Sequence, residues 1–64
     1  MKYISEGMIA FANNEKWGFM DKEGKKVIPP QFEEVCYFSE GLAPVKQNDK
    51  WGYIDKTGKF VISP

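Results

Sequence analysis

A tandem repeat with a period of 34 residues is the feature of this 64-residue sequence that most constrains its fold. The stretch NEKWGFMDKEGKKVI at residues 14–28 returns as NDKWGYIDKTGKFVI at residues 48–62. When the two copies are aligned, 15 of 30 residue pairs are identical. Units this short bury their apolar surface against a neighbour. We therefore predict one repeat domain, residues 1–64, with repeat 1 at residues 1–34 and repeat 2 at residues 35–64.

Two kinds of tight turn recur in each copy. Asn14-Glu15 and Asn48-Asp49 lie between alternating runs, and asparagine tolerates the positive φ of a two-residue hairpin turn. Further along, DKEG and DKTG place an aspartate where its side chain can accept from the backbone two residues on. The glycine of each tetrapeptide suits the left-handed position of a type I turn followed by a bulge. The predicted structural turn residues are therefore Asp21, Gly24, Asp55 and Gly58.

These turns divide each copy into a three-stranded antiparallel meander. The predicted strands are residues 8–13, 16–21 and 25–29 in repeat 1, and residues 42–47, 50–55 and 59–63 in repeat 2. In the connector PPQFEEVCYFSEG, Phe32, Val35 and Phe38 recur every three residues, which predicts a short helical turn laid on a sheet. The predicted fold class is all-β, with two tandem meanders of about 34 residues per repeat and no parallel crossover.

The register of these strands predicts apolar side chains on both faces of each meander. In repeat 2, Val45 is expected opposite Gly52 and Ala43 opposite Ile54, and across the next turn Ile54 opposite Phe60 and Gly52 opposite Ile62. The other face would carry Pro44, Trp51, Tyr53 and Val61. In repeat 1 the predicted division is Ile9, Phe11, Met20 and Ile28 against Ala10, Trp17, Phe19 and Val27. Two apolar faces imply that both become covered.

Charge and composition exclude several classes of partner. Nine lysines balance nine acidic residues, and the chain has neither arginine nor histidine, so we expect no nucleic-acid partner. No apolar run approaches the ~18 to 20 residues of a membrane span, so we expect no membrane partner. Cys36 is the single cysteine, and the N-terminal residues lack the apolar core of a signal peptide. These features predict a reducing, cytoplasmic location.

No residue pattern favours catalysis or cofactor binding. Asp21 and Asp55 could form a carboxylate pair, but each begins a turn of its own repeat and has no histidine partner. Cys36 is flanked by apolar residues and lacks an activating histidine, so it is interpreted as a passive small residue. Glu33-Glu34 is interpreted as a solvated pair, because two adjacent carboxylates alone hold no cation well. We expect no catalytic, cofactor or metal site.

The segment SEGLAPVKQNDKWGYIDKTGKFVISP resembles the WG-repeat family, also called KWG repeats, of bacterial proteins built from tandem units. The marks are Ser-Glu-Gly before the first strand, Lys-Trp-Gly-aromatic in the second, Asp-Lys-x-Gly-Lys in the turn and Val-Ile-x-Pro after it. The match covers both copies. The resemblance implies a β-rich repeat that mediates protein interaction or scaffolding, without shared catalytic residues or a cofactor.

Two functions are compatible with the sequence. The first is a non-enzymatic module for protein–protein interaction or self-assembly through apolar faces and edge strands, which would make the chain a homo-oligomer. The second is binding of a carbohydrate or cell-wall ligand, because exposed aromatic rings stack on sugars. The candidate interaction surface for both is Trp17, Phe19, Trp51 and Tyr53. An enzyme is not expected.

Overall fold

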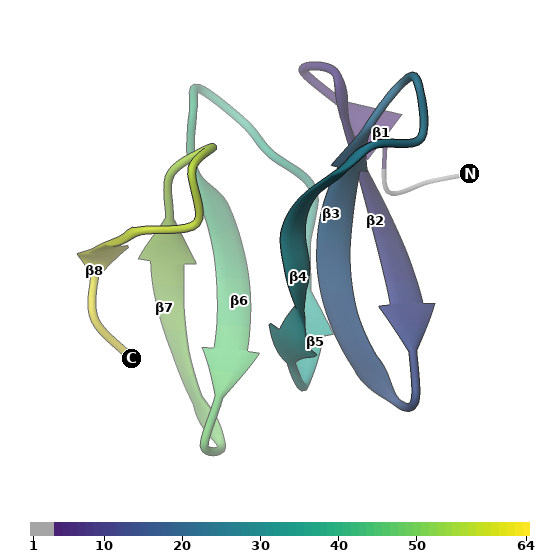
Figure 1. Cartoon of the computed structure of the whole chain (residues 1–64). Helices are drawn as coiled ribbons and strands as arrows, with labels where there is room; N and C mark the ends of the chain where they lie inside the picture. Colours follow the sequence, from purple (N-terminus) through teal and green to yellow (C-terminus); the bar gives the residue numbers. More distant parts are fainter. Residues whose placement is uncertain (1–3) are drawn as a thin grey trace.

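The computed structural model describes residues 4–64, which form two four-stranded antiparallel sheets (Figure 1). Sheet A contains, in spatial order, β1 (Ile4–Ser5), β2 (Met8–Asn13), β3 (Lys16–Asp21) and β4 (Lys26–Phe32). Sheet B contains β5 (Glu34–Val35), β6 (Ala43–Gln47), β7 (Lys50–Ile54) and β8 (Phe60–Ile62). Within each sheet, every strand pairs antiparallel with its neighbour in sequence, so the predicted all-β class with antiparallel meanders is confirmed.

Each meander is wider than the sequence predicted. β2 and β3 have the predicted bounds, whereas β4 continues to Phe32. Two short strands, β1 and β5, add a fourth member to each sheet by pairing Ile4 with Ile9 and Val35 with Val45. The residues before each Ser-Glu-Gly segment therefore pair with the strand that follows it.

The hairpin turns have the backbone that their asparagines predicted. Asn14 and Glu15 have φ of 54° and 67°, and Asn48 and Asp49 have φ of 53° and 68°. Positive φ at both central residues defines a type I′ turn, whose twist matches the right-handed twist of the paired strands. The turn fixes the register of β6 and β7, in which Val45 lies opposite Gly52 and Ala43 opposite Ile54, as predicted.

The helical turn predicted for the connector is wrong, because this segment is extended. Phe32 pairs with Trp17 as the end of β4, and the chain bends at Glu33 before β5. The backbone N–H of Glu33 donates to the carbonyl of Lys46 (2.9 Å), and that of Cys36 donates to the carbonyl of Pro44 (2.9 Å). Because sheet B satisfies these backbone groups, no helical turn forms.

The apolar residues of the connector recur every three positions without forming a helix. They lie where the chain passes from one sheet to the other. Phe32, Val35 and Phe38 are all buried, at 0%, 8% and 0% exposure. They enter the core between the sheets from successive positions of the crossing segment.

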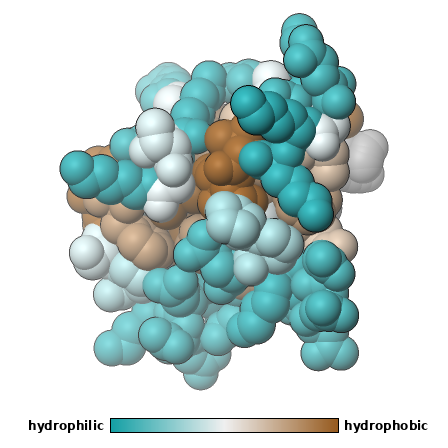
Figure 2. Space-filling model, in the orientation of Figure 1, coloured by the Kyte–Doolittle hydropathy of each residue, from teal (hydrophilic) through white to brown (hydrophobic). Residues whose placement is uncertain are grey.

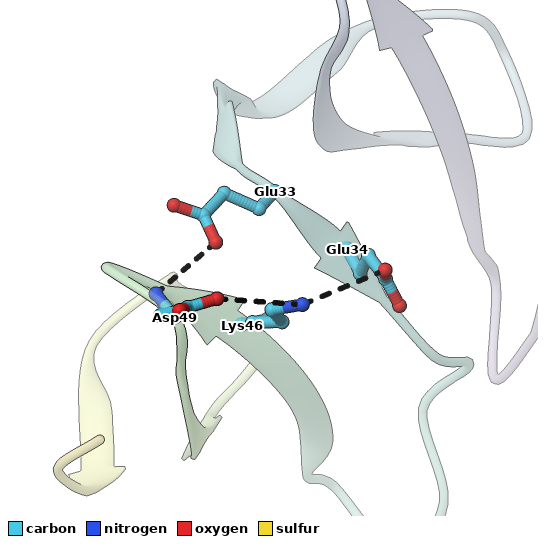
Figure 3. Close-up of polar contacts among 4 residues, drawn as sticks. All are labelled: Glu33, Glu34, Lys46 and Asp49. Atoms are coloured by element: carbon cyan, nitrogen blue, oxygen red, sulfur yellow. Dashed lines mark hydrogen bonds and ion pairs between the residues drawn. The ribbon is translucent and has the colours of Figure 1, made fainter.

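Charged side chains fasten the start of sheet B to its first hairpin (Figure 3). The Glu33 carboxylate accepts a hydrogen bond from the backbone N–H of Asp49 (3.1 Å). The Lys46 ammonium lies 3.7 Å from the Glu34 carboxylate and 3.8 Å from that of Asp49. Glu33 and Glu34 are therefore structural contacts across β5 and β6.

The two sheets pack front to back. β3 lies against β5 and β4 against β6. Sheet A turns Phe19 and Ile28 toward the core, whereas sheet B turns Val45 and Ile54 inward. In the 34-residue alignment Phe19 corresponds to Tyr53, which is exposed in sheet B, so the sheets bury opposite faces of the same repeat. Figure 2 shows hydrophobic surface near the middle of the view, framed by hydrophilic side chains.

Bulges in both sheets correct two details of the predicted faces. Ile62 pairs with Tyr53, not with Gly52, although Ile54 pairs with Phe60 as predicted. In repeat 1, Ile28 pairs with Phe19 and is buried with it, so it does not share a face with Ile9 and Met20. The register shift between these pairs inserts an extra residue on the outer strand. This residue is Val27 in β4 and Val61 in β8, and both are exposed.

Gly18 and Gly52 are required because the outer strand crosses them closely. A Cβ at Gly18 would meet the carbonyl oxygen of Ile28 and lie 2.7 Å from the nitrogen of Pro30. A Cβ at Gly52 would lie 2.6 Å from the carbonyl oxygen of Ile62 and 2.7 Å from the nitrogen of Pro64. The neighbouring atoms belong to the backbone, so they cannot rotate away. The glycine of each Trp-Gly pair thus admits the bulged strand.

Gly18→Ala should lower the free energy of unfolding by about 2 kcal/mol or more, because the added methyl group displaces the β4 backbone. Urea denaturation followed by far-UV circular dichroism measures this change. Lys16→Ala, an exposed site on the same strand, is the control and should change stability by less than about 0.5 kcal/mol. Equal stabilities of the two variants would contradict the close approach.

Candidate functional site

An exposed aromatic face covers the outer side of sheet B. We define it by Pro44, Trp51, Tyr53 and Ile62, which share this side through the pairing of Pro44 with Tyr53 and of Tyr53 with Ile62. Trp51 is 47% exposed, Tyr53 40% and Ile62 53%. These are large apolar side chains that contribute surface to solvent, and they follow directly from the parity of β7: Gly52 and Ile54 are buried, so their neighbours point outward.

An open pocket of about 450 Å³ lies at one end of the aromatic face of sheet B. Leu42, Pro44 and Tyr53 form its apolar wall. The remaining lining residues are Cys36, Tyr37, Ser39 and Glu40. Leu42 and Ser39 are held by a pair of reciprocal backbone hydrogen bonds at 2.8 and 3.1 Å, which fixes the turn at the rim. The pocket therefore combines an apolar wall with a carboxylate and a hydroxyl.

A second apolar face lies on the outer side of sheet A, at the opposite end of the stack. We define this aliphatic face by Ile4, Ile9, Phe11 and Met20, since Ile4 pairs with Ile9 and Ile9 with Met20. Ile4 is 60% exposed and the other three are half-buried. The Lys26 ammonium lies 5.8 Å from the centre of the Phe11 ring, where a cation is attracted to the aromatic face.

The four aromatic residues predicted as one interaction surface are divided by the structure. Phe19 is fully buried, and its ring meets that of Phe38 edge-on at 4.9 Å between centroids. Trp17 is half-buried and packs against the core. Trp51 and Tyr53 belong to the exposed aromatic face of sheet B. Equivalent positions of the two repeats therefore have different surroundings, one in the stack and one at its end.

The predicted turn residues lie at two equivalent loops, one between β3 and β4 and one between β7 and β8. Asp21 Oδ1 accepts from the backbone N–H of Glu23 and of Lys25, each at 2.9 Å. Asp55 Oδ1 accepts from the backbone N–H groups of Thr57 (2.9 Å) and Lys59 (3.1 Å) and from the Thr57 hydroxyl (2.6 Å). Gly24 and Gly58 have φ of 86° and 92°. The aspartates thus organise the loops that carry them.

The Thr57 hydroxyl lowers the pKa of the Asp55 carboxyl below its usual range, with further contributions from the backbone N–H groups of Lys59 and Thr57. All three groups stabilise the ionised form by hydrogen bonding. Asp55 is therefore a carboxylate held charged by its turn.

Glu6 links the two repeats, and sequence reasoning did not identify it. Its carboxylate accepts from the backbone N–H groups of Glu40 (2.7 Å) and Gly41 (3.0 Å) and lies 3.3 Å from the Lys56 ammonium. The Gly41 hydrogen bond, followed by those from Glu40 and Lys56, lowers the pKa of Glu6. The signal available in the sequence was the identity of Ser-Glu-Gly in both copies, which a turn alone does not require.

Residues 4–64 contain no group of three or more His, Cys, Asp or Glu side chains placed to hold a metal ion. Within the same range, no helix is long and apolar enough to cross a membrane.

The fold and its two faces define a tandem β repeat protein, in which each sheet covers one side of the next. The family model of the WG-containing repeat matches residues 17–51 and 51–64. The chain therefore belongs to the WG-containing repeat family. No curated protein and no solved structure matches the chain significantly.

Glu6→Ala should lower the midpoint of urea denaturation, because it removes two hydrogen bonds and an ion pair that join the repeats. Glu23→Ala, which removes an exposed carboxylate in a loop, is the control and should change the midpoint little.

The effect of Glu6→Ala should depend on pH. Because the pKa of Glu6 is lowered in the folded chain, the unfolded chain binds the proton more tightly, and stability rises with pH. This contribution is present above the ordinary carboxyl pKa and is lost as pH falls through the lowered value. The difference between wild type and Glu6→Ala should therefore shrink below about pH 4. A difference that stays constant into strong acid would contradict the role of the charge.

Proposed function

We propose that this chain is a non-enzymatic β repeat module that binds protein through the apolar faces at the two ends of its stack. The observation that carries the proposal is the aromatic face of sheet B, on which Trp51, Tyr53 and Ile62 are each exposed by 40% or more. Contiguous apolar patches on a folded protein mark interaction sites, and tryptophan and tyrosine are the side chains that most often anchor protein interfaces.

The interior of the chain supports this proposal. Phe19 and Ile28, at the positions of Tyr53 and Ile62 in the other repeat, are 0% and 1% exposed because a second sheet covers them. The same side of the repeat thus already contacts a protein surface once. A protein partner on sheet B would repeat that kind of contact.

The carboxylates support a structural role over a chemical one. Asp21 and Asp55 bind backbone N–H groups of their own turns, Glu6 binds those of the next repeat, and Glu33 binds that of Asp49. Each of these contacts maintains the fold. This use of the acidic side chains is consistent with a binding module.

Carbohydrate binding is the second candidate, and one observation favours it. Tyr53 forms a wall of the open pocket that Ser39 and Glu40 also line, so an aromatic ring and hydrogen-bonding groups converge there. Sugars are recognised by this combination of ring stacking and polar contacts. The proposed platform is smaller than the sequence predicted, because Phe19 lies in the core.

Sedimentation equilibrium on the 64-residue chain over a wide concentration range, with far-UV circular dichroism on the same samples, tests the proposal. A folded species with a mass that is a multiple of 7.4 kDa is expected. Trp51→Ala should weaken association by about tenfold or more, since truncating an aromatic anchor removes a large part of the binding energy. Lys50→Ala, at the neighbouring exposed position, should have little effect.

A folded monomer at every concentration would contradict self-association and direct attention to the pocket. In Trp17→Phe, Trp51 is the remaining tryptophan, so its fluorescence reports on the aromatic face of sheet B alone. A blue shift and protection from iodide on titration with oligosaccharides would then favour the carbohydrate function.

A further inference from the structure

The two exposed faces are the repeat counterparts of the two faces that already meet between the sheets. Between the sheets, the aromatic side of repeat 1 contacts the aliphatic side of repeat 2. At the ends of the stack, the remaining sides are the aromatic face of sheet B and the aliphatic face of sheet A. The strands of the two repeats pair in the same register. The aromatic face of sheet B is therefore the counterpart of the buried face of sheet A, and the aliphatic face of sheet A is the counterpart of the buried face of sheet B.

The central contact of the internal interface is a ring packed against a ring. Phe38 of repeat 2 lies at 4.9 Å from Phe19 of repeat 1. The residue equivalent to Phe38 is Ile4, which is 60% exposed on the aliphatic face of sheet A. The residue equivalent to Phe19 is Tyr53, which forms a wall of the open pocket. An exposed apolar side chain and an open pocket therefore lie at opposite ends of the stack.

A second contact shows the same relation. In the internal interface, the β7–β8 loop lies on Ile28, such that a Cβ at Gly58 would be 3.3 Å from that side chain. The equivalent Gly24 has no atom within 4 Å of its Cβ position. Ile62, the equivalent of Ile28, is 53% exposed. Gly24 and Ile62 are therefore the counterparts of a pair that meets inside the chain, and among residues 4–64 nothing lies close to the Gly24 Cβ position while Ile62 is exposed.

Polar groups at the rim show the same correspondence between the internal interface and the end faces. Inside the chain, the Glu6 carboxylate binds the N–H groups of Glu40 and Gly41 and the Lys56 ammonium. The equivalent Glu40 carboxylate has no hydrogen bond or ion pair with any residue from 4 to 64. Its equivalent donors, the N–H groups of Glu6 and Gly7, sit in a turn with φ of 55° and 78°, against 54° and 82° at Glu40 and Gly41.

We infer that a second copy of this chain docks head to tail, with its Ile4 in the Tyr53 pocket and its Glu6-Gly7 turn and Lys22 against Glu40. The inference rests on the proposed function and adds the partner and the orientation. The contact is heterologous, because different faces meet, so each bound copy presents a new face to the next. The assembly is therefore open or closes as a ring, and it does not stop at a two-fold dimer.

One position makes the contact between copies weaker than the contact within the chain. Phe60 packs edge-on against Phe32 in the internal interface, with ring centroids 6.1 Å apart, and its equivalent in repeat 1 is Lys26. The Lys26 ammonium lies over Phe11, on the aliphatic face of sheet A. A charge at this site reduces the apolar area that the second copy can bury. Docking between copies should therefore be weaker than the contact within the chain and should require a higher protein concentration.

Two variants that each block one face test the inference. Tyr53→Glu places a carboxylate on the aromatic face of sheet B, and Ile4→Glu places one on the aliphatic face of sheet A. Both sites are exposed. Far-UV circular dichroism on each variant tests whether it folds. Each variant alone should associate at least about tenfold more weakly than wild type, because a charge must be buried. Mixed in equal amounts, they should form a 1:1 dimer that grows no further, since one intact face of each remains.

Sedimentation equilibrium separates the outcomes. Wild type should exceed the mass of a dimer as concentration rises, and the mixture should stop at the dimer. A wild-type dimer that does not grow, or that Ile4→Glu leaves unchanged, would overturn head-to-tail docking while the proposed protein-binding function stands. A wild-type chain that remains a monomer would overturn the docking of a second copy and contradict self-association. If a dimer forms in either variant alone, the faces pair with themselves and the inference is wrong.

A second pair of variants tests the polar contacts by removing a carboxylate, without placing a charge on an apolar face. Glu40→Ala removes the carboxylate that would meet the second copy, so it should weaken association several-fold. It retains the backbone N–H that Glu6 binds, so it should leave the urea midpoint nearly unchanged. Glu6→Ala retains the N–H groups that the second copy uses and should lower the midpoint. If Glu40→Ala had no effect on association, the proposed orientation of the two copies would be wrong.

Discussion

Phe19, Ile28 and Phe32 are excluded from water because sheet B lies against them, and the rest of the structure depends on this contact. A single sheet of this size has no second layer with which to bury a face. The core is accordingly shared, with Met8, Phe19, Ile28 and Phe32 from sheet A and Val35, Phe38, Ala43, Val45 and Ile54 from sheet B and its connector. Neither repeat contains a complete core by itself, so the two sheets stabilise each other.

Polar contacts fix the alignment that the apolar contact alone would leave undefined. Glu6 reaches across to the turn at Glu40 and Gly41, while Glu33 and Lys46 hold β5 on the first hairpin of sheet B. These groups lie at the rim, where each exposed ion pair adds little stability. Their contribution is directional: the hydrogen bonds of Glu6 to two particular N–H groups favour one placement of the sheets, whereas apolar side chains tolerate several.

Local signals in the sequence predicted most of the sheets and less of their packing. Asn48-Asp49 predicted a turn and, through it, the pairing of Val45 with Gly52. The side of each sheet that becomes buried could not be predicted, because Phe19 and Met20 are both apolar and lie on opposite sides of β3. The extended connector was missed, since Phe32, Val35 and Phe38 also fit helical spacing. Of the four residues of the candidate surface, Trp51 and Tyr53 are exposed, whereas stacking buries Phe19 fully and Trp17 in part, which is a long-range effect.

The consecutive prolines of β4 restrict strand pairing at one edge of sheet A. β4 is an edge strand of sheet A, and Pro29 and Pro30 have no N–H group to offer a neighbouring strand. A strand from another chain that approached this edge would find gaps in the hydrogen-bonding ladder. Lateral addition of strands, the route to amyloid-like aggregates, is thus disfavoured at this edge, while the sheet faces stay accessible. A small protein with apolar surface on both faces can in this way limit uncontrolled aggregation at this edge without covering those faces.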